Sequence, residues 1–154
     1  MTHFDWQDYT KNHAPLVESW LDADTVRLTG LDEGFDEFFR YWRTESDPLR
    51  GELFWCKLVS ENRHPLAVIA YGYFKETVTI MEIILDPNVR GQGKGTAIIQ
   101  EFIKNAAKWI KQPISLFVAV VFEDNPASQK TFCKLGFVQD EGDTKLWKTR
   151  KCEE

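Results

Sequence analysis

The chain has 154 residues, of which 43% are hydrophobic and 14% aromatic, enough for one packed core. Its net charge of -5 disfavours nucleic acid as the main partner, and no apolar run approaches the roughly 20 residues of a membrane helix. Because the N-terminus also lacks the basic and apolar blocks of a signal peptide, we expect a single cytoplasmic domain over residues 1–154, with neither nucleic acid nor membrane as a partner.

Negative charge is concentrated in the first third of the chain. Residues 1–50 contain eleven Asp and Glu against five Lys and Arg, whereas residues 51–154 contain thirteen against fourteen. Such an acidic block is usually a solvated face. If its carboxylates instead face a cleft, they favour a cationic substrate.

Two helical patterns occupy this acidic third. Asn12 is a candidate cap for a helix over residues 12–21, and Asp32 for a second helix over residues 33–45. The second pattern places aromatic residues on one face and charged residues on the other. Three tryptophans, Trp20, Trp42 and Trp55, either pack in the core or border a pocket.

The next segment changes to the texture of strands. Residues 52–60, 65–75 and 77–85 are rich in aromatic and branched side chains and are separated by short breaks. We expect a three-stranded antiparallel meander.

A long helix and a buried strand follow the meander. Apolar residues recur at helical spacing from Gly93 to Ile110, and residues 114–122 are apolar on both faces. Because a long helix separates this strand from residues 77–85, the two strands should lie parallel. We therefore predict an α/β fold whose mixed sheet is mostly antiparallel.

The C-terminal part contains a short helix and two short strands. Asn125 followed by Pro126 resembles a helix start, and Gly136 closes the helix. The strands are expected at residues 137–139 and 144–150, on either side of a turn.

Three alternating glycines, Gly91, Gly93 and Gly95, stand between the strand at 77–85 and the long helix. They leave bare main-chain N–H groups at a helix N-terminus, a place that suits a phosphate. A nucleoside-triphosphate loop is excluded because Lys94 is followed by Gly95 instead of Ser or Thr. A dinucleotide fingerprint is excluded because its last glycine would fall on Thr96 or Ile98.

The spacing R-x-x-G-x-G, filled by Arg90, Gly93 and Gly95, resembles the acetyl-coenzyme A loop of the GCN5-related N-acetyltransferase (GNAT) superfamily. Two further segments support the resemblance, the lead-in "IILDPNV" and "NPASQKTFCKLGF" at 125–137. In addition, "APLVESWLDADTV" is similar to the first helix of the aminoglycoside 6'-N-acetyltransferase-like branch. The resemblance implies a GNAT-like fold, an acetyltransferase activity and acetyl-coenzyme A (acetyl-CoA) as the cofactor.

The resemblance also implies a splay between the parallel strands, at Met81 to Leu85 and Val118 to Phe122. A main-chain N–H near Ile84 or Leu85 would then bind the thioester carbonyl and stabilise its oxyanion, so Leu85 is a catalytic candidate through its backbone. Arg90 and Lys94 would add positive charge at the pyrophosphate. The residues implied in cofactor binding are Ile84, Leu85, Arg90, Gly91, Gln92, Gly93, Lys94, Gly95, Thr96, Asn125 and Ser128.

Glu82 is the one ionisable residue in the apolar strand at 77–85. An acceptor amine must lose a proton before attack, and a carboxylate in apolar surroundings has a raised pKa. Glu82 is a candidate catalytic base, a substrate-orienting anion, or a structural partner on the sheet. Strict alternation places it on the face of Ile80 and Ile84, and a bulge would change that phase.

Two positions near Asn125 leave alternatives open. Asn125 is a helix cap that either contacts the cofactor or does not, and the same alternatives hold for Ser128. Many GNAT proteins carry a tyrosine seven residues after this Asn, but this chain has Phe132. The departing thiolate would then take its proton from water or leave unaided, because Thr131 and Cys133 should point elsewhere on the helix.

Metal chemistry has no sequence signal in this chain. Its cysteines and histidines are widely spaced and form no C-x-x-C pair, so we expect reduced, inert thiols and no metal site. These residues are Cys56, Cys133, Cys152, His3, His13 and His64.

Taken together, the patterns and the resemblance predict an N-acetyltransferase, monomeric or homodimeric, that transfers acetyl directly to a primary amine of a small cationic molecule or peptide. One alternative is an acyltransferase that uses a hydroxylamine or hydroxyl acceptor. Another is a coenzyme A-binding sensor or scaffold without turnover, which the missing tyrosine favours.

Overall fold

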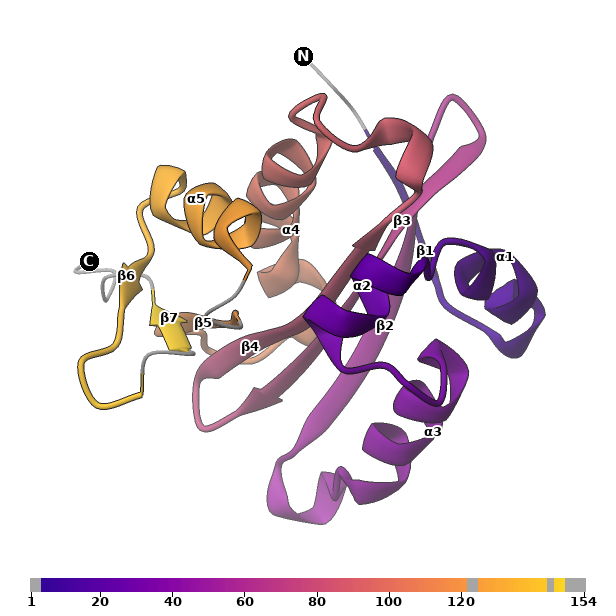
Figure 1. Cartoon of the computed structure of the whole chain (residues 1–154). Helices are drawn as coiled ribbons and strands as arrows, with labels where there is room; N and C mark the ends of the chain where they lie inside the picture. The colour runs from indigo at the N-terminus through magenta and orange to yellow at the C-terminus, as the bar shows by residue number, and fades with distance from the viewer. Residues whose placement is uncertain (1–3, 122–124, 144–145, 149–154) are drawn as a thin grey trace.

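The computed structural model describes residues 4–121, 125–143 and 146–148. Within them a seven-stranded sheet has the order β1-β2-β3-β4-β5-β7-β6, with helices on both faces (Figure 1). The strands are β1 (Asp5–Asp8), β2 (Leu53–Glu61), β3 (His64–Phe74), β4 (Thr77–Leu85), β5 (Leu116–Val120), β6 (Val138–Gln139) and β7 (Leu146–Lys148). The helices are α1 (Ala14–Ser19), α2 (Ala23–Thr29), α3 (Phe35–Glu45), α4 (Lys94–Ile110) and α5 (Pro126–Lys134). The predicted α/β class is confirmed: β4 and β5 are parallel, and the other pairs are antiparallel.

The predicted meander is present as β2, β3 and β4. Two-residue turns join its strands, and both residues of each turn have positive φ: Asn62 and Arg63 in the first, Lys75 and Glu76 in the second. Such turns match the right-handed twist of the flanking strands, which explains why short breaks suffice here.

The start of α3 differs from the prediction. The helix begins at Phe35, and Asp32 does not cap it. Glu18 takes that role from α1, because its Oε1 accepts hydrogen bonds from the N–H groups of Phe35 (2.7 Å) and Asp36 (3.0 Å). The cap is thus supplied by a residue distant in sequence, which a search for local caps does not find.

Other features of the first third also differ. Asn12 is not a helix cap, because it lies inside the 3-10 turn Lys11–His13 and α1 begins only at Ala14. The edge strand β1 and the helix α2 were not predicted. β1 has only four residues, most of them polar and exposed, so its pattern is weak.

Two apolar clusters pack on opposite faces of the sheet. One joins the sheet to α4 and α5 and includes Ile80, Ile98, Phe102, Phe132 and Phe137. The other joins it to α1 and α3 and includes Val17, Phe35, Phe39, Val68 and Ile84. No helix in the described ranges is both long and apolar enough to cross a membrane.

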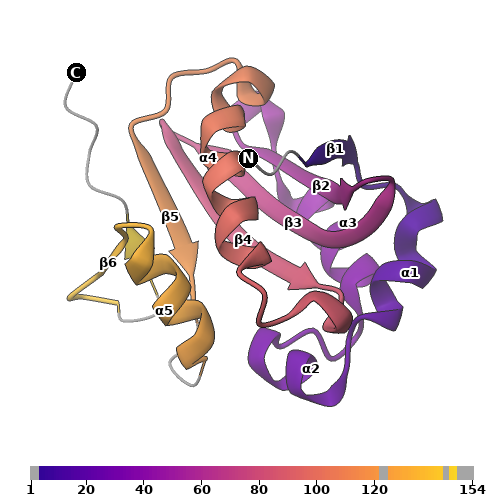
Figure 2. The same cartoon turned by 90° about the horizontal axis from the view of Figure 1, so that it is seen from above.

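A β-bulge interrupts β4 at Met81. Ile80 pairs with Tyr71 and Glu82 with Ala70, which leaves Met81 between the two pairs. The parallel pairing with β5 ends at the same place, since it covers Thr77–Ile80 alone among the described residues. Beyond this point β4 and β5 diverge, as Figure 2 shows. The expected splay is therefore present, but on β5 it begins only at Val120, because Val118 and Ala119 still pair with β4. Phe122 lies outside the described residues.

Candidate active site

A glycine-rich turn joins β4 to α4. Gly91 and Gly93 have φ of 76° and 75°, left-handed values that glycine adopts at little cost, and the space where a Cβ would stand is open at both. Gly93 is the N-cap of α4 and offers no side chain to the first turn. The N–H groups of Lys94, Gly95 and Thr96 are therefore available to an anionic ligand, which the helix dipole favours.

Arg90 ties this turn to α2. Its Nη1 lies 2.7 Å from Asp22 Oδ2, and its Nη2 donates to Thr25 Oγ1 at 2.7 Å. Hydrogen bonds from Thr25, and then from Arg90, lower the pKa of Asp22 to about 2. The guanidinium charge is thus already paired with a carboxylate of the protein.

Lys94 is paired in a similar way. Its Nζ lies 2.8 Å from Glu61 Oε1, at the end of β2. From the sequence, Arg90 and Lys94 are expected to add charge at a pyrophosphate. In the structure, their ion pairs hold the glycine turn against α2 and the end of β2.

The turn lines a cavity of about 370 Å³, here named the loop cavity, which extends along the end of β4 to α5. The residues implied in cofactor binding all line it except Gln92, whose side chain donates to Asn88 O at 3.1 Å. Helix α2 adds lining residues that the sequence analysis missed: Asp24, Thr25, Leu28 and Thr29. Two residues in the sequence could have predicted this helix: Asp22, which caps its N-terminus, and Gly30, which ends it with a positive φ.

Main-chain groups of β4 face the gap between β4 and β5. Asp86 N–H donates to Leu66 O on β3 at 2.8 Å. In an antiparallel pair, the main-chain N–H groups that bond to the neighbouring strand belong to every second residue. The N–H group of Ile84 therefore also points to β3, and the N–H groups of Ile83 and Leu85 point the other way, into the gap. Of the two N–H donors considered from sequence, the register favours Leu85 over Ile84 and adds Ile83, whose side chain also lines the loop cavity.

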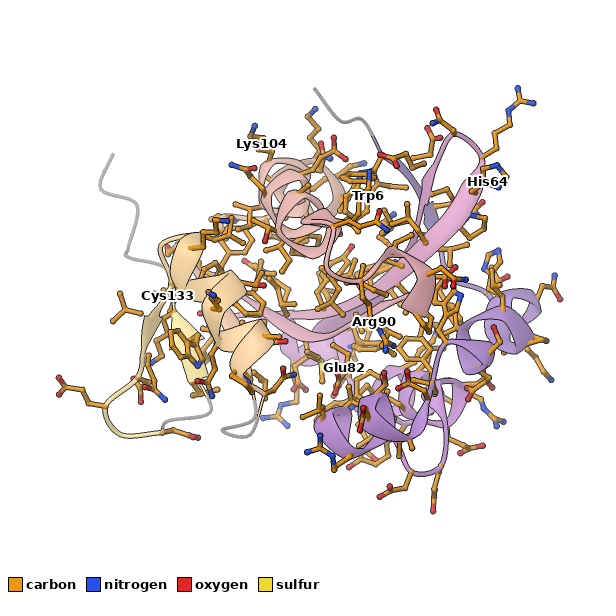
Figure 3. The ribbon with its side chains drawn as sticks, turned by 45° about the horizontal axis from the view of Figure 1, so that its top comes forward. Trp6, His64, Glu82, Arg90, Lys104 and Cys133 are labelled. Carbon is orange, nitrogen blue, oxygen red and sulfur yellow. The ribbon has the colours of Figure 1, made fainter. Side chains whose placement is uncertain are left out.

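Glu82, labelled in Figure 3, follows the bulge in β4 and is half-buried. It shares a face of the sheet with Ile84, which packs towards α1 and α3, whereas Ile80 packs towards α4. The alternation prediction is therefore wrong for Ile80, because the extra residue Met81 changes the phase. Burial raises the pKa of Glu82 to about 8, and its carboxylate has no hydrogen-bond or ion-pair partner within the described ranges.

The start of α5 borders the same region. Asn125 caps the helix by accepting from Ser128 N–H at 3.2 Å, and both residues line the loop cavity. Phe132 is buried against Phe137, with ring centroids 5.0 Å apart, and offers no proton donor. Thr131 was expected to point elsewhere but also lines the loop cavity, although its hydroxyl donates to Ala127 O at 3.0 Å.

The cysteines that the structure describes lie outside this region. Cys56 is buried in the core, and Cys133 is exposed on α5 (Figure 3). Both thiols are free. Cys152 and His3, also named in the sequence analysis, lie outside the described residues.

A second cavity, of about 640 Å³, lies between α3 and the sheet and is here named the aromatic cavity. Its wall includes Phe38, Trp42, Phe54, Tyr73 and Phe74. Of the three tryptophans considered from sequence, only Trp42 lines it; Trp20 is buried in the core, and Trp55 borders a separate hollow.

A small chamber of about 50 Å³, the junction chamber, lies between the two cavities. It shares Ile83, Asn125, Ser128 and Phe132 with the loop cavity. It shares Met81, Glu82 and Val120 with the aromatic cavity. Ligands in the two cavities would therefore meet beside Glu82, where β4 and β5 part.

Comparisons with known proteins agree with this geometry. A family model described as the acetyltransferase (GNAT) family matches residues 14–137. The uncharacterized N-acetyltransferase MJ1207 of Methanocaldococcus jannaschii is 36% identical over 67 residues, which are 44% of this chain and 28% of that relative. The chain thus spans just over a quarter of the length of this relative.

Solved structures share the whole fold at low sequence identity. A domain from Methanocaldococcus jannaschii is 16% identical with a TM-score of 0.70, over 97% of this chain and 99% of its own. The ribosomal-protein-S18-alanine N-acetyltransferase of Escherichia coli is 13% identical with a TM-score of 0.65, over 99% and 96%.

Proposed function

We propose that this chain, which belongs to the GNAT family of acetyltransferases, transfers an acetyl group from acetyl-CoA directly to a primary amine of a small cationic molecule or peptide. The observation that carries the proposal is the junction chamber, through which the loop cavity and the aromatic cavity meet beside one carboxylate. Two cavities that meet allow both substrates to be held at once. Direct transfer is favoured because no cysteine is among the described residues that line the chamber.

The loop cavity fits acetyl-CoA, which supplies an acetyl group activated as a thioester. The N–H groups of Lys94, Gly95 and Thr96 would hold the pyrophosphate at the start of α4, without a metal ion. The pantetheine arm would follow the gap between β4 and β5 towards Glu82. Family members use this cosubstrate, and the glycine turn leaves the close approach that a pyrophosphate needs.

Catalysis would divide between the backbone and Glu82. An N–H group of Leu85 or Ile83 would hold the carbonyl oxygen as it gains negative charge, an effect typically worth roughly 3 kcal/mol per donor. Glu82, once deprotonated, would take a proton from the acceptor ammonium. The amine nitrogen then bonds to the carbonyl carbon as the C–S bond breaks. Of the three ammonium protons, one stays on the amide, one reaches the thiolate and one is released to solvent.

A second candidate function is a coenzyme A sensor without turnover. It is favoured by Phe132, which stands where many family members have a tyrosine and provides no proton for the thiolate. Among the described residues, the polar side chains of the junction chamber other than Glu82 are Thr29, Asn125 and Ser128, so water or one of the two hydroxyls would replace that tyrosine.

Two measurements decide between these functions. Calorimetric titration with acetyl-CoA should show saturable binding, and thiol release should appear when a primary amine is added to the complex. Binding without thiol release over a broad panel of amines would favour the sensor. Absence of binding to well-folded protein would contradict both functions.

A further inference from the structure

The aromatic cavity restricts which amines can reach Glu82. Resting on the proposed function, we propose that the acceptor is a singly charged primary amine on an aromatic body, whose ring packs against Phe38, Trp42 and Phe54 while its amino group reaches Glu82. This class excludes polyamines and aminoglycoside-like compounds, which carry several charges.

The wall of the cavity is suited to an apolar ring. Helix α3 contributes Phe38 and Trp42, and β2 contributes Phe54, whose ring centroid lies 6.3 Å from that of Phe38. Trp42 keeps 36% of its surface exposed, although it stands beside a cavity that an apolar ligand would fill. Aromatic side chains pack against another ring, and their faces also attract a nearby cation.

Most hydroxyl groups of the wall already have partners. Ser46 donates to Trp42 O at 2.7 Å, and Tyr73 donates to Pro113 O at 2.7 Å. Thr77 donates to Lys75 O at 3.5 Å. A polyhydroxylated acceptor would therefore find few hydroxyl donors in the wall to replace those of water, which costs affinity.

The charged residues that line the cavity, among those the structure describes, match one ammonium group. Glu82 is at its inner end, and Glu52 and Lys75 are near the turn between β3 and β4. Lys75 lies over the ring of Phe74, with Nζ 5.2 Å from the centroid, and its charge is opposite to that of Glu52. On β3, the four residue steps from Ala70, which pairs with Glu82, to Phe74 span roughly 13 Å. An amine at Glu82 with a ring in the middle fits this length, whereas a second ammonium at the other end would face the cation of Lys75 as well as the carboxylate of Glu52.

The acidic block at residues 1–50 does not supply further negative charge to this cavity. None of its eleven Asp and Glu is among the lining residues. Asp22 pairs with Arg90, Asp8 with Lys57, and Asp36 and Glu37 with Arg40. The sequence favoured a cationic substrate only if the carboxylates of the acidic block face a cleft. At the aromatic cavity they do not.

Equilibrium binding of small amines tests the class without depending on turnover. Calorimetry would compare 2-phenylethylamine, ethylamine, spermidine and kanamycin, on free protein and on protein saturated with coenzyme A. We expect 2-phenylethylamine to bind at least about tenfold more tightly than each of the others. Equal or tighter binding of spermidine or kanamycin would overturn the inference. If acetyl-CoA itself does not bind, the proposed function fails, while the order of amine affinities on free protein still tests the cavity.

Two tryptophan variants locate the site. Trp42→Ala should weaken 2-phenylethylamine about tenfold and change spermidine less than twofold. Trp55→Ala is the matched control, because Trp55 is similarly exposed, at 41%, but does not line the aromatic cavity. Circular dichroism would verify that both variants fold. Equal effects of the two variants on 2-phenylethylamine would place the amine elsewhere and overturn the inference.

Discussion

Glu82 owes its position to one extra residue in β4. Without the bulge at Met81, strict alternation would turn the Glu82 side chain away from the face on which Met81 and Thr79 line the aromatic cavity. With the bulge, Met81 and Glu82 both border that cavity and the junction chamber. The same bulge ends the pairing with β5, so a single irregularity both opens the gap and places a carboxylate beside it.

A pH profile of the rate tests the role of Glu82 as base. Because burial raises its pKa to about 8, the base form gains population as the pH rises through that value. We expect kcat/KM of the wild type to rise up to about pH 8, and Glu82→Gln to lower it about a hundredfold above that pH but much less at pH 6. Stopped-flow thiol release would give both profiles. A uniform loss at every pH would assign Glu82 to substrate orientation instead.

The stability of the protein should carry the same signature. A carboxyl whose pKa is raised from 4.5 to about 8 favours folding most below pH 4.5, and this contribution is lost as the pH rises through 8. Between pH 5 and pH 8, Glu82→Gln should therefore gain about 3 kcal/mol in free energy of unfolding relative to the wild type. Urea denaturation at the two pH values measures this difference. A constant difference would show that the carboxyl is not desolvated in the folded protein.

At the scale of elements, the start of α4 and its glycine turn form the anion site. Gly93→Val should weaken acetyl-CoA by at least about a hundredfold, because the new side chain would occupy the approach of the pyrophosphate. Gly51→Val is a matched control, since Gly51 also has positive φ (80°) and open space but lies outside the loop cavity. Both changes impose a similar backbone strain of roughly 1–2 kcal/mol. Calorimetry should find that Gly51→Val binds acetyl-CoA as tightly as the wild type and that Gly93→Val does not. Equal losses of affinity in both variants would show that backbone strain lowers binding by destabilising the fold.

Helix α2 depends on Arg90 for its contact with the glycine turn. Arg90→Met removes the bonds to Asp22 and Thr25, together with weaker ones to the carbonyl oxygens of Trp20 and Leu85. Because the ion pair is half exposed, we expect a loss of only about 1 kcal/mol in stability. Hydrogen exchange of α2 amides should accelerate about tenfold while that of α4 stays unchanged. Equal protection of α2 in variant and wild type would show that Arg90 does not hold this helix.

At the scale of the whole molecule, the two cavities share β4 but are otherwise built from different elements. The glycine turn, α2, α5 and the end of β4 line the loop cavity, whereas α3, β2, β3 and the earlier part of β4 line the aromatic cavity. The affinity of each cavity for its ligand should therefore be nearly independent of changes in the other cavity. Trp42→Ala should change acetyl-CoA affinity less than twofold, and Gly93→Val should change the affinity of free protein for the amine less than twofold. Cross-titration by calorimetry checks both. A large cross-effect would indicate that closure of one cavity forms the other.

Much of the fold followed from local patterns. The aromatic and branched side chains of β3, the helical spacing from Ile98 to Ile110 and the Asn125-Pro126 start each act within one element, so they could be predicted from sequence. Caps and short elements could not. Glu18 caps α3 from another helix, and β1 is a strand because it pairs with β2.

The sequence by itself determined the glycine turn, its place between a strand and a helix, and the single carboxylate of β4, because these features need only neighbouring residues. Tertiary structure alone decided which face Glu82 takes, that Arg90 and Lys94 are ion-paired, and that the acidic block lies outside the aromatic cavity. The physical reason is range. A bulge is fixed by the register between β3 and β4, and an ion pair by chain segments that meet only after folding.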